Sequence, residues 1–140
     1  MVGARRIIVK TVDGGQTWER DIQGNSRLHD VAFTDSLSGW VVGQNGTILK
    51  TTDGGDNWTS RGISTHEALN GVAAMDSAIL VVGNNGLIAT SSNAGAAWIV
   101  RRSGATEHLF GVAALSDYEM WATGAAGIVQ GEKALGRIEY

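Results

Sequence analysis

The sequence predicts an all-β fold built from repeated, four-stranded antiparallel sheets. The first observation is an eight-residue motif that recurs every 40 residues, as TVDGGQTW (11–18), TTDGGDNW (51–58) and SSNAGAAW (91–98). The second is a short apolar segment before each motif, and the third is a set of glycine-anchored turns between the segments. Four short strands in about 40 residues are typical of a β-propeller blade.

Each unit is expected to contain four strands joined by turns. The first strand is the segment of the form LxxVAx, at 28–33, 69–74 and 109–114. The second resembles GWVVG, the third resembles ILKT, and the fourth begins at the tryptophan of the motif. Asn-Gly pairs stand between the second and third strands at 45–46 and 85–86. They indicate tight hairpins, because their positive backbone φ suits the twist of the strands.

The period predicts one repeat domain over residues 1–140. Its expected units are a half blade at 1–26, blades at 27–66 and 67–106, and a partial blade at 107–140. In the last unit IVQG (128–131) keeps the third strand, but the motif has become GEKALGRI, with Ile138 in the place of the tryptophan. The chain thus contains roughly 3.5 blades, a partial propeller or half-ring.

Composition excludes several classes of protein. Hydrophobic residues make up 43% and charged residues 18% of the chain, which is enough for a buried core. A net charge of -3 argues against nucleic acid or an anionic membrane as the main partner. The absence of cysteine excludes disulfides and thiol nucleophiles. No apolar run has the length of a signal-peptide core or a membrane span, so we expect neither, and localisation stays unknown.

The recurring motif matches the Asp-box, also called the sialidase or BNR repeat, and we interpret it as structural. The carboxylate can accept hydrogen bonds from amides of its own turn, the glycine can adopt positive φ, and the tryptophan can pack between strands. One carboxylate per repeat at fixed local spacing indicates a folding signal, so we expect no catalytic or metal-binding role. The expected structural residues are Thr11, Asp13, Gly15, Trp18, Thr51, Asp53, Gly55, Trp58, Ser91, Gly95 and Trp98.

The stretch GWVVGQNGTILKTTDGGDNW (39–58) resembles the blades of the photosystem II stability and assembly factor family. The resemblance extends over residues 7 to about 131 of this sequence. It implies a propeller, which in that family has seven blades, and a role in assembly through protein binding without catalysis. Members of the family are often exported or lumenal.

A half-ring leaves apolar sheet faces open at both ends, which favours association. Three arrangements are open: a piece of a larger propeller, a small closed form, or a homodimer that completes a ring of about seven blades. We favour the homodimer, because two half-rings match the number of blades in the family.

Arginines close to the motif tryptophans are candidates for binding a protein partner. Arg20, Arg61 and Arg101 follow these tryptophans by two or three residues, and Arg102 comes next. Guanidinium groups on adjacent blades could bind carboxylates of a partner. The alternative is that these charges protect the outermost strands from aggregation. The three histidines fall in separate units, so we predict no metal site and no cofactor.

The sequence therefore favours a non-catalytic interaction scaffold. The first alternative is a carbohydrate-binding module or degenerate glycosidase, and the second is a fragment without independent activity. A sialidase-like site would need clustered arginines and a Tyr–Glu pair, but Tyr118 and Glu119 fall in an expected turn. The orientation of Trp40 and Trp121 separates the first two classes, since open indole faces beside polar loops would favour sugar stacking.

Overall fold

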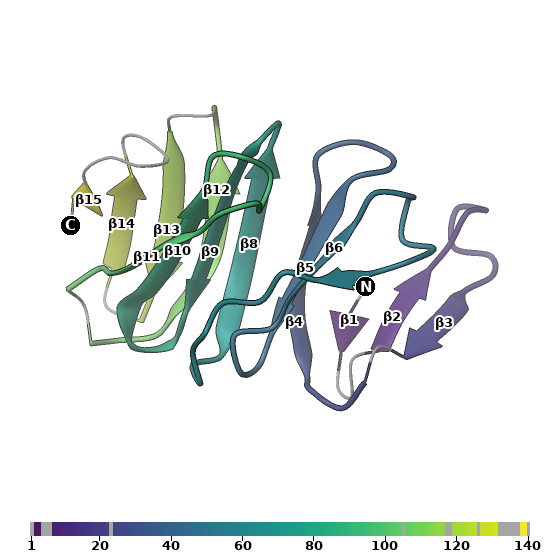
Figure 1. Ribbon diagram of the computed structural model, residues 1–140, viewed down its shortest axis with the longest axis horizontal. Coiled ribbons are helices and arrows are strands. Elements are labelled where there is room, and N and C mark those ends of the chain that lie inside the picture. The colour runs from purple at the N-terminus through teal and green to yellow at the C-terminus, as the bar shows by residue number, and fades with distance from the viewer. Residues whose placement is uncertain are drawn as a thin grey trace.

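The structure is a computed structural model that describes residues 2–3, 7–22, 24–104, 106–116, 119–125, 127–131 and 138–139. The described strands form four antiparallel sheets that stand in a row, as Figure 1 shows. A single 3₁₀ turn at Asn84–Gly86 interrupts the strands of the described ranges. The prediction of an all-β fold of four-stranded antiparallel sheets is confirmed.

The strands follow the chain order within each sheet. The first sheet contains β1 (Val2–Gly3), β2 (Ile7–Lys10) and β3 (Glu19–Ile22). The second contains β4 (Leu28–Phe33), β5 (Gly39–Gly43), β6 (Ile48–Thr51) and β7 (Thr59–Ser60). The third contains β8 (Leu69–Met75), β9 (Ala78–Gly83), β10 (Leu87–Ser91) and β11 (Ile99–Arg102). The fourth contains β12 (Leu109–Ala114), β13 (Met120–Gly124), β14 (Gly127–Gly131) and β15 (Ile138–Glu139).

The first sheet differs from the expectation of two strands. The short strand β1 pairs with β2 through Val2 opposite Ile8 and Gly3 opposite Ile7. The described part of this sheet therefore has three strands, which correspond to the second, third and fourth strands of the other sheets.

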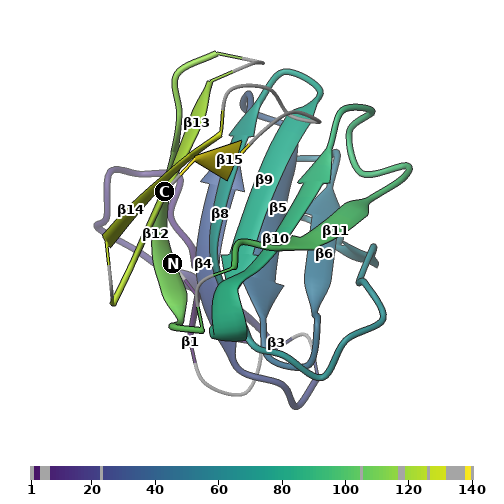
Figure 2. The same ribbon diagram turned by 90° about the vertical axis from the view of Figure 1, so that its left-hand side faces the viewer.

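The first strands of neighbouring sheets lie side by side, β4 beside β8 and β8 beside β12, whereas the fourth strands lie at the outer edge. Figure 2 looks along the row from its C-terminal end and shows the sheets one behind another. A bulge occurs at the second residue of β4, β8 and β12, and in β4 and β8 this residue reaches the next sheet. His29 Nδ1 donates to the carbonyl of Leu69 at 2.9 Å, and Asn70 Nδ2 donates to that of Leu109 at 2.9 Å. These bonds tie the inner strands together.

Three apolar layers fill the spaces between the sheets. The middle sheets bury residues on both faces because successive side chains of a strand point in opposite directions. In β5, for example, Val41 packs toward the first sheet and Val42 toward the third. All of β5 and all of β9 are consequently buried. A blade in this fold is thus stabilised mainly by its two neighbours.

Candidate protein-interaction surface

The carboxylates of the first two Asp-box turns are fully engaged within their own turns. Asp13 Oδ1 accepts the hydroxyl of Thr11 at 2.8 Å and the amide of Thr17 at 2.9 Å, and Oδ2 accepts the Thr17 hydroxyl. Asp53 accepts the Thr51 hydroxyl at 2.8 Å in the same way, and Asn57 donates both its backbone amide and its side-chain amide. Each carboxylate therefore closes one hairpin.

The third turn makes the Oδ1 bonds of the first two turns without a carboxylate, whereas Ala97 has no side chain to make the Oδ2 bond. Asn93 Oδ1 accepts the Ser91 hydroxyl at 2.9 Å and the Ala97 amide at 2.9 Å. The amide of Gly95 donates to Ser91 Oγ at 2.9 Å, as Gly15 and Gly55 donate to the threonines of their turns. Because an amide oxygen suffices, the turn needs an acceptor at this position and not an acid.

The hydrogen bonds also fix the protonation state of both aspartates. The side-chain hydrogen bond from Thr17, followed by the backbone amide of Thr17, lowers the pKa of Asp13 to about 2. Asn57 has the same effect on Asp53, whose pKa is also about 2. A general acid needs a pKa close to the working pH. These two groups are ionised throughout the neutral range and are unsuited to donating a proton.

The two aspartates predict a loss of stability in acid. Their folded pKa is depressed from 3.8, so the ionised forms stabilise the fold above the unfolded pKa. This contribution is lost as the pH falls from about 4 to about 2. We expect the melting temperature, followed by circular dichroism, to fall steeply in this window. The double variant Asp13→Asn with Asp53→Asn should flatten the slope, since an amide does not titrate there and Asn93 shows that an amide oxygen can accept the Oδ1 bonds. An unchanged slope would assign the acid sensitivity to other carboxylates.

The tryptophans differ widely in exposure. Trp40 is only 1% exposed, and its ring lies edge-to-face with that of Trp98 at a centroid distance of 6.0 Å. Lys50 Nζ lies 5.0 Å from the centroid of the Trp40 ring. Trp121 is half-buried, and its Nε1 donates to Glu119 at 3.2 Å. Trp40 is a core residue without a free face for a sugar, which removes one of the two side chains on which a carbohydrate site would depend.

The arginines do not all occupy one strand position. The amide of Arg61 donates to the carbonyl of Ile48, and Arg101 stands opposite Ile88, the equivalent of Ile48. Arg20 stands opposite Val9, one residue further along the strand, so its side chain leaves the opposite face of the sheet. Asp21 occupies the position of Arg61 and Arg101 in the first sheet.

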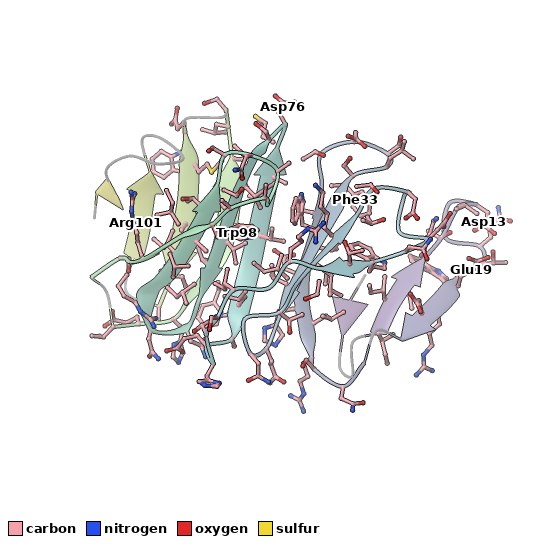
Figure 3. The ribbon with its side chains drawn as sticks, viewed as in Figure 1. Asp13, Glu19, Phe33, Asp76, Trp98 and Arg101 are labelled. Carbon is pink, nitrogen blue, oxygen red and sulfur yellow. The ribbon has the colours of Figure 1, made fainter. Side chains whose placement is uncertain are left out.

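Arg102 is engaged in local contacts. Its Nη1 donates to the carbonyls of Asn84 and Asn85 at 3.3 Å, and its Nη2 lies 3.4 Å from Glu67. Arg61 is exposed and makes a long hydrogen bond of 3.4 Å to the carbonyl of Ser60. Arg101 is half-buried on β11, where Figure 3 labels it. Arg61 and Arg101 thus form the equivalent pair at the outer edge of neighbouring sheets, and we call this the arginine edge.

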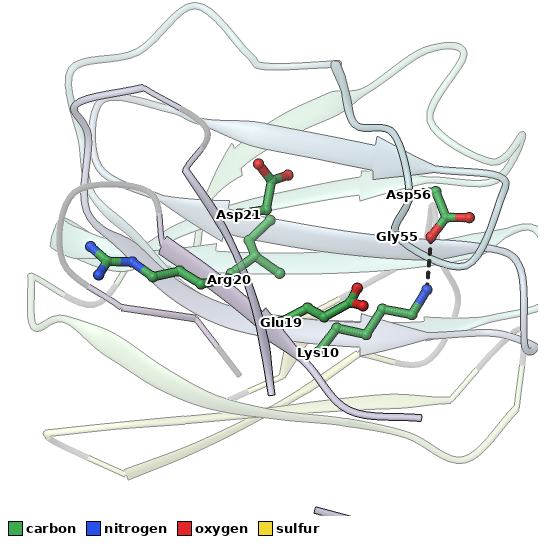
Figure 4. Close-up of a pocket in the computed structure, with 7 residues that line it drawn as sticks. Lys10, Glu19, Arg20, Asp21, Gly55 and Asp56 are labelled. Carbon is green, nitrogen blue, oxygen red and sulfur yellow. Dashed lines mark hydrogen bonds and ion pairs between the residues drawn. The ribbon is translucent and has the colours of Figure 1, made fainter. Parts of the chain in front are cut away.

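A shallow hollow of about 190 Å³ lies between the first sheet and the second Asp-box turn (Figure 4). Lys10 Nζ binds Asp56 Oδ1 at 2.8 Å across it, and this bond raises the pKa of Lys10. Arg20 lines the hollow together with Glu19 and Asp21. The hollow is smaller than typical small-molecule sites and mixes charges of both signs. Its main feature is therefore an ion pair between two sheets.

Within the described ranges, no three His, Asp or Glu side chains are grouped so that they could hold a metal ion. The described part of the chain also contains no helix of the length and apolar character that a bilayer crossing requires. Tyr118, considered above with Glu119, lies outside the described residues.

Four-stranded antiparallel blades with Asp-box turns define this chain as part of a BNR-type β-propeller. The model of the family described as photosynthesis system II assembly factor YCF48 matches residues 19–103, more than half of the chain. The chain belongs to this family, as the resemblance of residues 39–58 predicted. None of the curated proteins matches it.

Two solved structures are similar to the chain. One is described as YCF48 bound to D1 peptide, with 21% sequence identity and a TM-score of 0.73. The other is YCF48 from Cyanidioschyzon merolae, with 22% identity and a TM-score of 0.71. Each alignment covers 81% of this chain and 39% of the other chain. The chain therefore corresponds to about two-fifths of these propellers, and the likeness shows the fold.

Proposed function

We propose that this chain is a non-catalytic scaffold that binds a segment of another protein and acts in assembly. The observation that carries the proposal is membership of the YCF48 family, together with the likeness to a YCF48 structure that is bound to D1 peptide. The geometry of the Asp-box turns supports the absence of catalysis in this proposal, because Asp13 and Asp53 are ionised and held in their turns. The likeness to the D1 peptide complex supports a peptide segment as the partner class.

The arginine edge is the proposed contact surface. Arg61 and Arg101 occupy equivalent positions of adjacent sheets, so the two residues recur at the spacing of the blades. Guanidinium groups bind carboxylates through strong, charge-assisted hydrogen bonds. The more exposed Arg61 is expected to contribute more than the half-buried Arg101. We propose an acidic peptide segment as the ligand of this edge, with the loops at the rim as additional contacts.

Binding of the labelled D1 peptide, followed by fluorescence anisotropy, tests this function. The double variant Arg61→Gln with Arg101→Gln is expected to bind at least about tenfold more weakly, because charged hydrogen bonds are lost. Added salt should weaken binding of the wild type and have less effect on the variant. Arg27→Gln is the matched control, because Arg27 is exposed but lies before β4, away from the edge.

Equal affinity of the double variant and the wild type would show that the arginine edge is the wrong surface. No binding of the peptide at any salt concentration, together with retention on a glycan array, would replace the protein-binding proposal by the carbohydrate alternative.

We also propose that two copies associate to complete a ring. The four described sheets change the expected count, because two copies contribute eight sheets instead of about seven blades. Propellers of about four to eight blades are typical, so eight sheets are compatible with closure. The division of the chain at residues 26, 66 and 106 stays a prediction.

A further inference from the structure

Two tryptophans form a contact between the second and third sheets, which we call the aromatic junction. Between the second and third sheets, Trp40 of β5 packs edge-to-face on Trp98, which directly precedes β11. The third Asp-box turn also sits on the Trp40 indole, since a Cβ atom at Gly95 would lie 2.2 Å from the ring. The junction therefore consists of a tryptophan on one sheet and the glycine–tryptophan turn of the next.

The tryptophan half of this junction recurs on the last sheet. Trp40 stands opposite Ala32 and Lys50, and Trp121 stands at the same position of β13, opposite Ala113 and Gln130. The neighbours of Trp121, Met120 and Ala122, pack against the third sheet. Because side chains alternate along a strand, Trp121 lies on the other face, which no described sheet covers.

The turn half of the junction recurs on the first sheet. Trp18 corresponds to Trp98 and directly precedes β3, but it is 53% exposed. The φ angle is +92° at Gly15 and +80° at Gly95, so the two turns have similar backbone conformations. Figure 1 shows β3 and the fourth sheet at opposite ends of the row. Each end of the described chain thus carries one half of the aromatic junction.

The next pair of units has neither half of the junction. In the third sheet Leu80 stands at the position of Trp40, opposite Ala73 and Thr90. The following unit has Ile138 where its motif would have a tryptophan. In these two pairs of neighbouring units, Trp40 accompanies Trp98, and Leu80 accompanies Ile138. By this pairing, we expect Trp121 to meet an Asp-box turn that contains a tryptophan. The first turn of this chain, with Trp18, is such a turn.

We propose that Trp121 of one copy packs on Gly15 and Trp18 of a second copy, head to tail. Each copy carries both Trp121 and the turn with Gly15 and Trp18. Two copies can therefore form two such contacts and close on each other without further subunits. This proposal rests on the pairing of two copies proposed above and adds the place where they meet. A second copy fits because the matching turn is present on the same chain.

Sedimentation velocity measures this contact. The wild type is expected to sediment as a dimer, and Trp18→Ala and Trp121→Ala should each dimerise at least about tenfold more weakly. Both variants should keep the circular dichroism spectrum of the wild type, because neither side chain is fully buried in a single copy. Val12→Ala is the control, since Val12 belongs to the same turn, is 81% exposed, and has the exposed equivalents Thr52 and Ser92.

Mixing the two variants tests the head-to-tail arrangement. A mixed dimer of Trp18→Ala with Trp121→Ala contains one intact contact, so the mixture should dimerise more tightly than either variant alone. A monomeric wild type, open-ended polymers, or tryptophan variants that dimerise like the wild type would overturn the proposal. Binding of D1 peptide by a monomeric wild type would overturn only this contact and leave the proposed scaffold function in place.

Discussion

Replacement of Trp40 by alanine is expected to lower the free energy of unfolding by about 3–5 kcal/mol. The indole is 1% exposed and lies between the second and third sheets, in contact with Trp98 and Lys50. Its removal would leave a cavity that two rigid sheets cannot fill. Urea denaturation followed by far-UV circular dichroism gives the free energy directly.

Trp18→Ala is the matched comparison for this loss. Trp18 is the same residue type but is 53% exposed, so the expected change is below about 1 kcal/mol at protein concentrations too low for association. If the two variants were equally destabilised, Trp40 would not be the packing centre of the junction between the second and third sheets. The comparison therefore separates burial between sheets from the general effect of losing an indole.

The second large effect is expected for Gly95→Ala. Gly95 has a φ of +80°, where an alanine costs about 1–2 kcal/mol. Its added Cβ would also lie 2.2 Å from the Trp40 ring, and such overpacking costs about 1–3 kcal/mol more. We expect a total loss of about 2–5 kcal/mol in urea denaturation.

Gly14→Ala isolates the backbone part of this cost. Gly14 has a φ of +72°, but no other atom lies within 4 Å of the position that a Cβ would take, so an alanine there meets only the conformational penalty. Equal losses at Gly14 and Gly95 would show that the third turn can move away from Trp40. A larger loss at Gly95 would support close contact between this turn and the preceding sheet.

The strands could be predicted because the repeat makes several weak local signals coincide. The 40-residue period, the Asn-Gly turns and the Asp-box motifs all mark the same boundaries. The strand β1 was not predicted because Val2–Gly3 is two residues long and has none of the GWVVG pattern that marks the second strand elsewhere. Its pairing with β2 is a tertiary feature that the local sequence does not encode.

The candidate site was harder to predict, because distance from a motif does not fix the face of a strand. Arg20 follows its tryptophan by two residues and Arg61 by three, and this single residue places them on opposite faces. The motif tryptophans show the same limit. Trp18 is exposed whereas Trp98 is half-buried, although their turns are alike, because burial depends on the sheet that precedes each turn.

The third Asp-box turn has a consequence for how such proteins vary. Asn93 makes the Oδ1 bonds that the aspartates make in the other turns, with a neutral side chain. The shape of the hairpin therefore does not depend on whether the side chain at this position is charged. Exchange of acid for amide at such a turn would change which surfaces the molecule attracts or repels, while the blade keeps its outline.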